Sequence, residues 1–380
     1  MKIAGMAYAL PSRQVTNEMV IEEFRRQNRK FFFVRNMLAK KLREALEHSG
    51  TRIRYHRAPG ETAVDFALQA GREALERAEI APEAVDLVIY TGVGRAWLEP
   101  AMAHLFKSLL GLRAATCFDV TDACASWVRS LSVAKSFLDQ GTYKTALIIN
   151  AEFNCQECGG LAPGRKDPKA LYYKTPLRRP QDLYYRVAGY TIGEAATATV
   201  LVADGQPDNF HVSLKSWEQS YDLCQITLPN AEQFLGHGGS RSRQGPLEFY
   251  AAPKELLAFV VEKLTEHYQS DAQLSKDPHD IIFCHDVSDV STSAGIKQFV
   301  PEYADRVYRT YARFGNTVSA SIPLGMAMAL KEGKLQPGMR VLIVCGSAGV
   351  TTGFCKFTYV PAHRHREEPV SAAVGIKSQG

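Results

Sequence analysis

Residues 119–141, "DVTDACASWVRSLSVAKSFLDQG", place a cysteine where a strand-like run gives way to a helix-like run. From Trp127 onward, apolar residues recur at helical spacing, and Gly141 is well placed to end the helix. Cys124 is therefore predicted to lie in the first helical turn, where unpaired N–H groups and the helix dipole lower the pKa of a thiol. The stretch alone leaves two interpretations open: a nucleophile, or a small buried residue that packs a tight turn.

Similar strand-like and helix-like runs alternate along the chain. The strand-like runs are "KIAGMAYAL", "VDLVIYTGV", "ATCFDVT", "TALIINAE", "ATATVLVAD", "DIIFCHDV" and "RVLIVCGSAG". Helical patterns cover residues 62–78, 99–110, 124–139, 252–269 and 317–332. This alternation predicts an α/β fold with largely parallel central sheets.

The chain also contains an internal repeat. "LSVAKSFLDQGTYKTALIINAE" and "LGMAMALKEGKLQPGMRVLIVCGS" each predict a helix, a glycine turn and a buried strand. We therefore predict two similar halves, residues 1–205 and 206–380. Residues 153–190 are rich in Tyr, Arg, Lys and Pro without periodicity, which predicts a long functional excursion from the first half.

Composition excludes several classes of protein. A net charge of +5 is too mild to predict nucleic-acid binding, and the apolar runs are too short to predict insertion into a membrane. The beginning, "MKIAGMAYALPSRQV", lacks the apolar core of a signal peptide, so we expect a cytoplasmic protein. The single CxxC, formed by Cys155 and Cys158, has no second pair, so no metal site is predicted.

Two residues in the second half are candidate partners of Cys124. His285 follows the strand-like "DIIFC", and Asn316 stands between a glycine and a helical pattern. Either residue alone is usually structural, and an asparagine before a helix is often a cap. Three such residues at equivalent junctions of a duplicated unit favour a cysteine nucleophile with nitrogen-bearing partners.

These motifs together resemble the thiolase superfamily, and within it the β-ketoacyl-ACP synthase III-like condensing enzymes. The resemblance is carried by "IAGMAYALPSRQVTNEMV", "ETAVDFALQAGREALERAEIAPEAVDLVIYTG", "FDVTDACASW", "GEAATATVLVAD" and "FGNTVSASIPLGMAMAL". It covers nearly the whole chain apart from residues 153–190 and the tail after about residue 360.

The resemblance implies a five-layer αβαβα fold of two pseudo-equivalent halves that functions as a homodimer. It implies that Cys124 is acylated by an acyl-CoA or acyl carrier protein thioester, with no cofactor besides that substrate. His285 and Asn316 would bind the carbonyl of a second thioester and stabilise its enolate, which attacks the acyl group on Cys124. The result would be a new carbon–carbon bond.

The chain departs from the family pattern in two places. "CGSAGVTTG" keeps Gly346 and Gly349 in the turn expected to share an oxyanion hole with Cys124, but Ser347 and Ala348 stand where glycine is common. The usual Gln-Ala-Asn after the histidine reads Asp-Val-Ser, with no basic residue soon after it. Docking of a carrier protein there is not expected, and the basic residues of the 153–190 excursion are a candidate substitute.

Glu99, in "WLEP", indicates which type of condensation the enzyme carries out. The pattern resembles the branch that joins two acyl thioesters head to head without decarboxylation, in olefin, α-pyrone and dialkylresorcinol biosynthesis. There a glutamate reaches across the dimer into the partner's active site. A plain acyl thioester must lose an α-proton, which requires a carboxylate in a partly apolar site, here beside Trp97 and Leu98. The alternative is that Glu99 caps a helix beginning at Pro100.

Three other functions remain open at the level of sequence. The enzyme could condense malonyl units with decarboxylation, or Cys124 could pass its acyl group to a hydroxyl or amine of a natural product. A non-catalytic subunit of the same fold is the third, and the presence of the cysteine, histidine and asparagine argues against it.

Overall fold

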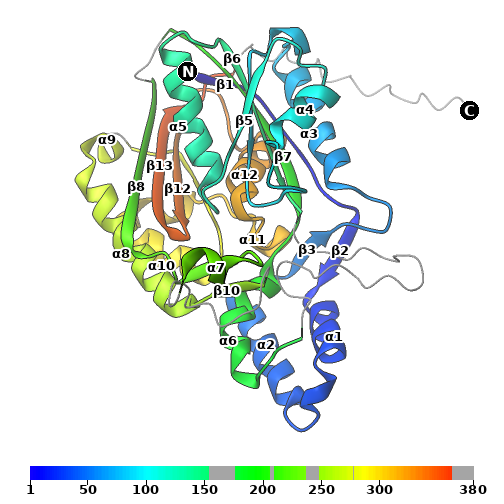
Figure 1. Ribbon diagram of the computed structural model, residues 1–380. Helices are drawn as coiled ribbons and strands as arrows, with labels where there is room; N and C mark the ends of the chain where they lie inside the picture. The colour runs from blue at the N-terminus through cyan, green and yellow to red at the C-terminus, as the bar shows by residue number, and fades with distance from the viewer. Residues whose placement is uncertain (154–175, 206–208, 237–247, 277, 362–380) are drawn as a thin grey trace, which may run out of the picture.

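The computed structural model describes residues 1–153, 176–205, 209–236, 248–276 and 278–361 (Figure 1). Within these residues the first sheet has five strands in the order β1-β7-β6-β4-β5. The strands are β1 (Lys2–Ala9), β4 (Leu87–Thr91), β5 (Thr116–Val120), β6 (Thr145–Glu152) and β7 (Ala195–Val202). β4 runs parallel to β5 and β6, whereas β7 runs antiparallel to β6 and β1.

The second large sheet has four strands among the described residues, in the order β11-β12-β13-β8. They are β8 (Phe210–Ser220), β11 (Ile281–Cys284), β12 (Arg340–Ser347) and β13 (Gly349–Thr358). Only the β11–β12 pair is parallel, so the pairing repeats that of β4, β6, β7 and β1 in the first sheet. Both sheets are mixed, and the prediction of largely parallel sheets is wrong. A strand that returns through a short turn, as β13 does after β12, must run antiparallel.

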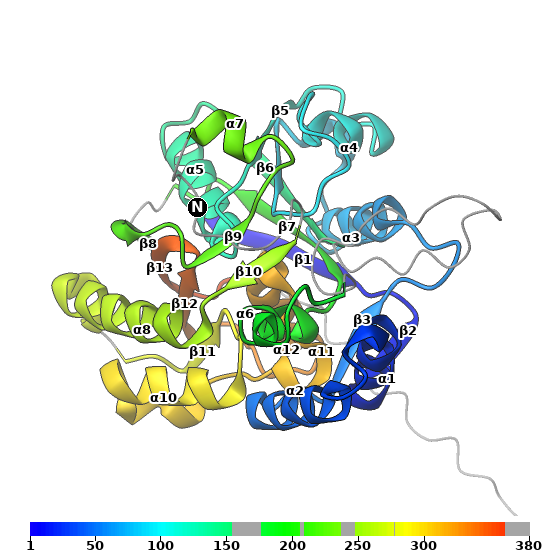
Figure 2. The ribbon, with the colours of Figure 1, turned by 60° about the horizontal axis from the view of Figure 1, so that its bottom comes forward.

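The helices form three layers around the two sheets. α5 (Ser126–Asp139) and α12 (Ser321–Lys331) lie between the sheets. α3 (Ala63–Arg77) and α4 (Ala103–Leu109) cover the outer face of the first sheet, while α8 (Pro253–Ser270) and α10 (Asp289–Phe299) cover that of the second (Figure 2). This arrangement confirms the expected αβαβα fold.

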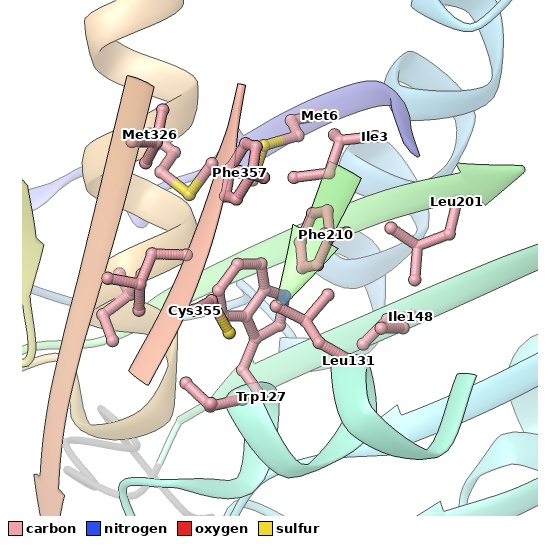
Figure 3. Close-up of a cluster of buried hydrophobic side chains, with 14 of the residues drawn as sticks. Ile3, Met6, Trp127, Leu131, Ile148, Leu201, Phe210, Met326, Cys355 and Phe357 are labelled. Carbon is pink, nitrogen blue, oxygen red and sulfur yellow. The ribbon is translucent and has the colours of Figure 1, made fainter. Parts of the chain in front are cut away.

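The central layer holds the main hydrophobic core. Trp127 and Leu131 of α5 project towards Phe210 and Cys355 of the second sheet (Figure 3). All four side chains are buried, and the indole N–H of Trp127 donates to the hydroxyl of Thr199, 3.1 Å away. Full burial of each large apolar side chain contributes roughly 1.5–3 kcal/mol, so this layer holds the two halves together.

Three predicted helices begin later than their sequence patterns suggested; one of them is α12, which starts at Ser321 rather than at residue 317. α5 starts at Ser126 rather than at residue 124, and α4 starts at Ala103 rather than at residue 99. The start of α4 is set by Asp119 at the end of β5, whose carboxylate accepts from the N–H groups of Met102 (2.8 Å) and Ala103 (2.9 Å). A capping acid from another strand cannot be read from the local pattern.

Several elements were not predicted from the sequence, because they are short or lie outside the repeated units. A two-stranded sheet joins β2 (Arg13–Thr16) to β3 (Ile53–His56), and another joins β9 (Cys224–Ile226) to β10 (Phe249–Ala251). The remaining helices are α1 (Asn17–Gln27), α2 (Arg35–Ser49), α6 (Leu183–Arg186), α7 (Ala231–Leu235), α9 (Ala272–Ser275) and α11 (Tyr311–Phe314). No helix among the described residues is long and apolar enough to cross a bilayer.

The 153–190 excursion is described only in part. Residues 154–175, with both cysteines of the CxxC, lie outside the described residues. In the described part, the N–H of Leu177 donates to Oδ1 of the buried Asn28, 2.8 Å away. The first large sheet ends at Val202 and the second begins at Phe210; the division of the chain at residue 205 stays a prediction.

Candidate active site

A cavity of about 340 Å³ brings together three of the predicted site residues, Cys124, His285 and Asn316. They come from the junction of β5 with α5, from the end of β11, and from the loop between α11 and α12. Gly346 also lines the cavity. The remaining walls are mostly apolar and include Val93, Ile192, Ile226, Phe249, Leu256, Leu257, Val260, Val287 and Val318.

Cys124 stands in a tight turn before α5 rather than in its first helical turn. The preceding residue, Ala123, has φ of 44°, in the left-handed region that a side chain rarely adopts. The N–H of Ala125 approaches the carbonyl oxygen of Asp122 (2.9 Å) and the hydroxyl of Ser347 (3.1 Å). The Ser347 hydroxyl in turn donates to the same carbonyl of Asp122, 3.1 Å away. A residue from the second half therefore fixes the turn that carries the cysteine.

The electrostatics of the turn differ from the sequence-based expectation. Burial raises the pKa of Cys124 well above the usual range of a thiol, and the nearby Cys224, Cys345 and Glu152 act in the same direction. The prediction of a thiolate stabilised by a helix N-terminus is therefore wrong for the resting protein. A thiol in this cavity needs a base that accepts its proton when it attacks.

His285 provides a neutral imidazole in the same cavity. Burial lowers the pKa of His285 to about 4, so the ring is uncharged at neutral pH. Its Nδ1 lies 2.8 Å from Oγ of Ser321, and that hydroxyl lies 2.7 Å from the carbonyl oxygen of Val318. When Ser321 donates to Val318, Nδ1–H donates to Ser321 and Nε2 carries the free lone pair. The imidazole can then accept a proton at Nε2.

Asn316 has its side-chain amide held in one orientation. Its Oδ1 accepts from the N–H of Val318 at 2.8 Å, which leaves the NH2 group as the part of the amide available to donate. The neighbouring Gly315 has φ of 65°, and a Cβ there would lie 2.3 Å from the carbonyl oxygen of Thr191. Only glycine fits this position, which explains the Gly-Asn pair in the sequence.

A buried carboxylate that was not predicted from the sequence contacts the N–H of Val93, a residue that lines the cavity. Glu152, at the end of β6, accepts from the N–H groups of Val93 (3.1 Å) and Gly94 (3.0 Å) and from the hydroxyl of Ser319. Burial raises the pKa of Glu152. Glu152 thus joins the loop after β4 to the loop that carries Asn316. The only sign of it in the sequence is an acidic residue at the end of the apolar run "TALIINAE".

Glu99 and Gly349 are placed differently from the other predicted site residues. Glu99 is exposed, in a loop with the exposed Trp97 and Leu98, and it is not among the described residues that line this chain's cavity. Because α4 begins at Ala103 and Asp119 accepts from its first N–H groups, the alternative that Glu99 caps this helix is wrong. Gly349 is exposed and also lies outside the cavity lining.

The residues after His285 serve the fold. Asp286 is buried and accepts from the hydroxyl of Thr292 at 2.5 Å, while Arg309 lies 3.5 Å away. Ser288 caps α10 by accepting from the N–H of Ser291 at 3.3 Å. The unusual Asp-Val-Ser therefore anchors the start of α10 against the body of the protein.

Two segments of the chain match models of a known protein family. The family model described as 3-oxoacyl-[acyl-carrier-protein] synthase III matches residues 118–156, and the model of its C-terminal part matches residues 270–359. The first match contains Cys124, and the second contains His285 and Asn316.

Solved structures of OleA from Xanthomonas campestris share the fold at 21% sequence identity. A variant with bound lauric acid and lauroyl-CoA, in which a cysteine is replaced by serine, has a TM-score of 0.76 over 94% of this chain and 98% of that chain. Variants in which a glutamate or a histidine is replaced by alanine each give a TM-score of 0.74 with the same coverage.

The chain therefore has the αβαβα fold of these structures, the thiolase-like fold that the sequence motifs suggested. The two segments that contain Cys124, His285 and Asn316 are similar to the β-ketoacyl-ACP synthase III family of condensing enzymes. The expectation that the protein is an enzyme of the acyltransferase type is confirmed.

Proposed function

We propose that the enzyme joins two acyl thioesters head to head by a Claisen condensation, with Cys124 carrying the first acyl chain. The observation that carries this proposal is the meeting of Cys124, His285 and Asn316 in one largely apolar cavity. An acyl chain suits the apolar walls, and the three polar side chains suit the chemistry of a thioester carbonyl. The substrate is an acyl thioester of coenzyme A or of an acyl carrier protein.

The first half-reaction transfers an acyl group to Cys124. His285 Nε2 takes the thiol proton as sulfur attacks the thioester carbonyl, and the departing thiolate then recovers that proton. The main-chain N–H of Cys124 and the turn at residues 346–348 are the proposed donors to the oxyanion. The Ser347 hydroxyl is not one of them, because it donates to the carbonyl of Asp122.

The second half-reaction uses the same two nitrogen-bearing side chains. Asn316 Nδ2 and the Nε2–H tautomer of His285 donate to the carbonyl of the second thioester and stabilise its enolate. The enolate carbon attacks the acyl carbon on Cys124, the carbon–sulfur bond breaks, and the thiolate of Cys124 takes up a proton. The products are a β-ketoacyl thioester and the free enzyme.

Glu99 is the proposed base that removes the α-proton, and it acts in the partner subunit of a homodimer. Two observations support this role: Glu99 is exposed and outside its own cavity, and the adjacent Trp97 and Leu98 are exposed apolar side chains. An aromatic and an aliphatic side chain beside a carboxylate fit insertion into another chain's apolar cavity. OleA, which shares the fold, binds lauroyl-CoA, and an acyl thioester of this kind is the proposed substrate here.

Intact-protein mass spectrometry with acyl-CoAs of increasing chain length tests the nucleophile. The wild type should gain the mass of one acyl group, and Cys124→Ala should gain none. Cys224→Ala is the matched control, because it removes the other thiol that lines the cavity and should acylate normally. Acylation that persists in Cys124→Ala would overturn the assignment.

Product analysis then separates the reactions. Condensation of acyl-CoA alone supports the non-decarboxylative reaction. A strict requirement for malonyl-CoA would show a decarboxylative enzyme instead. Appearance of esters or amides, only when an alcohol or amine is added, would show transfer from Cys124 to a natural product.

A further inference from the structure

The turn that joins α1 to α2 ends in two bare aromatic side chains. Phe32 is 71% exposed and Phe33 is 96% exposed, and their rings contact each other edge to face with centroids 5.4 Å apart. The two helices stand out from the body of the protein, with this turn, residues 28–34, at their far end (Figure 1). Adjacent exposed phenylalanines at a protruding tip indicate an interaction surface.

The tip and the adjoining ends of the two helices are rich in basic residues. Residues 25–43 contain eight basic residues and no aspartate or glutamate. The basic residues are Arg25, Arg26, Arg29, Lys30, Arg35, Lys40, Lys41 and Arg43. The charge of this segment exceeds the protein's net charge of +5, so the rest of the chain is net negative. Arg26, Lys40 and Arg43, at the ends of the segment, pair with glutamates of the two helices.

The base of the helix pair is well packed, so the exposure of the tip is not the result of a loose segment. Phe24 and Leu42 are fully buried in a cluster with Leu177 and Tyr190. The rings of Phe24 and Tyr190 meet edge to face, with centroids 5.6 Å apart. The packed base keeps the two aromatic side chains exposed to water. Exposure of apolar rings to water is unfavourable in free energy unless a partner covers them.

The apolar cluster at the base also reaches the active-site cavity. Ile192 and Val318 belong to it, and Phe249 and Cys124 pack against it. All four of these residues line the cavity. At the other end, Phe31 and Val34 of the tip pack against the same cluster. One continuous set of apolar side chains therefore connects the exposed tip with the site that holds the acyl chain.

We propose that this tip, residues 28–34, docks the enzyme on an anionic lipid surface. Phe32 and Phe33 seat at the level of the headgroups, while Arg29 and Lys30 contact lipid phosphates. A convex tip with two projecting rings suits a fluid surface, and the excess of basic residues suits a negatively charged one. No described helix spans a membrane, so the association is peripheral. Docking itself does not depend on the proposed reaction.

Co-sedimentation of the full chain with extruded vesicles tests the proposal. The wild type should bind vesicles with about 30% phosphatidylglycerol in phosphatidylcholine, and bind pure phosphatidylcholine at least about tenfold more weakly. Raising the salt concentration from about 0.1 to 0.5 M should release most of the bound protein, because it screens the basic side chains.

Two double variants test the aromatic and the basic side chains of the tip separately. Phe32→Ser with Phe33→Ser should lower binding by about tenfold or more, and Arg29→Glu with Lys30→Glu should abolish the preference for anionic vesicles. Phe234→Ser is the matched control, because Phe234 is 85% exposed on α7 and has an acidic neighbour, Glu232. Acylation of Cys124 by a short, soluble acyl-CoA should be equal in all variants, which reports an intact fold.

Three results would overturn the proposal. The first is a wild type that does not sediment with anionic vesicles at low salt. The second is vesicle binding that survives both double variants or falls equally in Phe234→Ser. The third is retention on an immobilised acyl carrier protein, lost in the tip variants, without vesicle binding; it would show that an acidic protein occupies this surface.

Discussion

Oγ of Ser321 lies between two hydrogen-bond partners, 2.8 Å from Nδ1 of His285 and 2.7 Å from the carbonyl oxygen of Val318. The hydroxyl has one hydrogen and can give it to either atom. When it donates to Val318, Nε2 of His285 is free to accept a proton; when it donates to Nδ1, Nε2 carries the hydrogen and can donate. The two half-reactions need these two states in turn. The change of state requires the ring to lose its proton at Nδ1 and to hold one at Nε2, and rotation of the Ser321 hydroxyl lets it pair with Nδ1 in either tautomer.

Ser321→Ala should therefore slow both half-reactions. We expect kcat to fall by about 10- to 100-fold, with a smaller change in KM, because the imidazole loses its orienting partner. The pH profile of acylation should also shift, which loss of packing alone would not cause. Ser321→Thr keeps the hydroxyl and should recover most of the rate. Equal rates for the alanine variant and the wild type would show that Ser321 does not position His285.

The sequence predicts the local part of this site well. Cys124, His285 and Asn316 each follow a strand or a glycine turn, and such junctions can be recognised from periodicity alone. The orientation of these residues is set by distant ones: Ser347 reaches the Cys124 turn across 222 positions in the chain. No local pattern predicts that contact. For this reason the helical placement and the lowered thiol pKa expected for Cys124 are both wrong.

The same reasoning applies to the elements around the site. All five strands of the first sheet and β11 and β12 of the second were predicted, because their apolar runs are uninterrupted; β8 and β13 of the second sheet were not. The mixed pairing was not, because direction depends on which strands become neighbours. Glu152 was also missed, since its role comes from contacts with Val93 and with Ser319, 167 positions away in the chain.

Glu152→Gln should destabilise the protein by about 1–3 kcal/mol, because an NH2 group would then face a main-chain N–H that now has an acceptor. Urea unfolding at neutral pH measures this change in the free energy of unfolding. Glu83→Gln is a suitable control, because Glu83 is exposed, and it should change that free energy by less than about 0.5 kcal/mol. We also expect slower condensation in Glu152→Gln, because Glu152 joins the loops that carry Val93 and Ser319. An unchanged free energy would mean that the buried carboxylate contributes nothing to the fold.

Asp119→Ala should loosen the start of α4. The variant removes both acceptors of the Met102 and Ala103 N–H groups, which should cost about 1–2 kcal/mol. Asp119→Asn keeps one acceptor oxygen, so its loss in the free energy of unfolding should be about half as large. Thermal unfolding gives the ranking of the three proteins. If alanine and asparagine are equally harmful, the cap is not the reason for the loss.

Stability should fall in mildly acidic solution because of buried histidines. Burial lowers the pKa of His56 to about 3 and those of His267, His279 and His285 to about 4. Since these values lie below the value of about 6.5 in the unfolded chain, the unfolded state binds more protons between pH 6.5 and 4. The free energy of unfolding should thus fall as the pH drops through this window, by on the order of 2 kcal/mol per histidine at pH 5.

Urea unfolding at pH 7, 6 and 5 checks this dependence. Glu152 and Asp286 act in the opposite direction, because burial raises their pKa, but they are fewer than the buried histidines. His279→Gln should reduce the slope, and His48→Gln, at an exposed position, should leave it unchanged. A free energy of unfolding that is constant from pH 7 to 5 would contradict the prediction.

Glu99 should act across the subunit boundary, and mixed dimers can show this directly. Glu99→Ala should keep acylation of Cys124 but lose condensation by about 100-fold or more. Cys124→Ala should lose both. A dimer with one chain of each kind contains one complete site only if Glu99 reaches the partner's cavity, because that site takes its cysteine from one chain and its glutamate from the other. Random mixing of the two variants should then restore roughly a quarter of the wild-type rate. If Glu99 served its own chain, every site in the mixture would lack one group, and no activity would return.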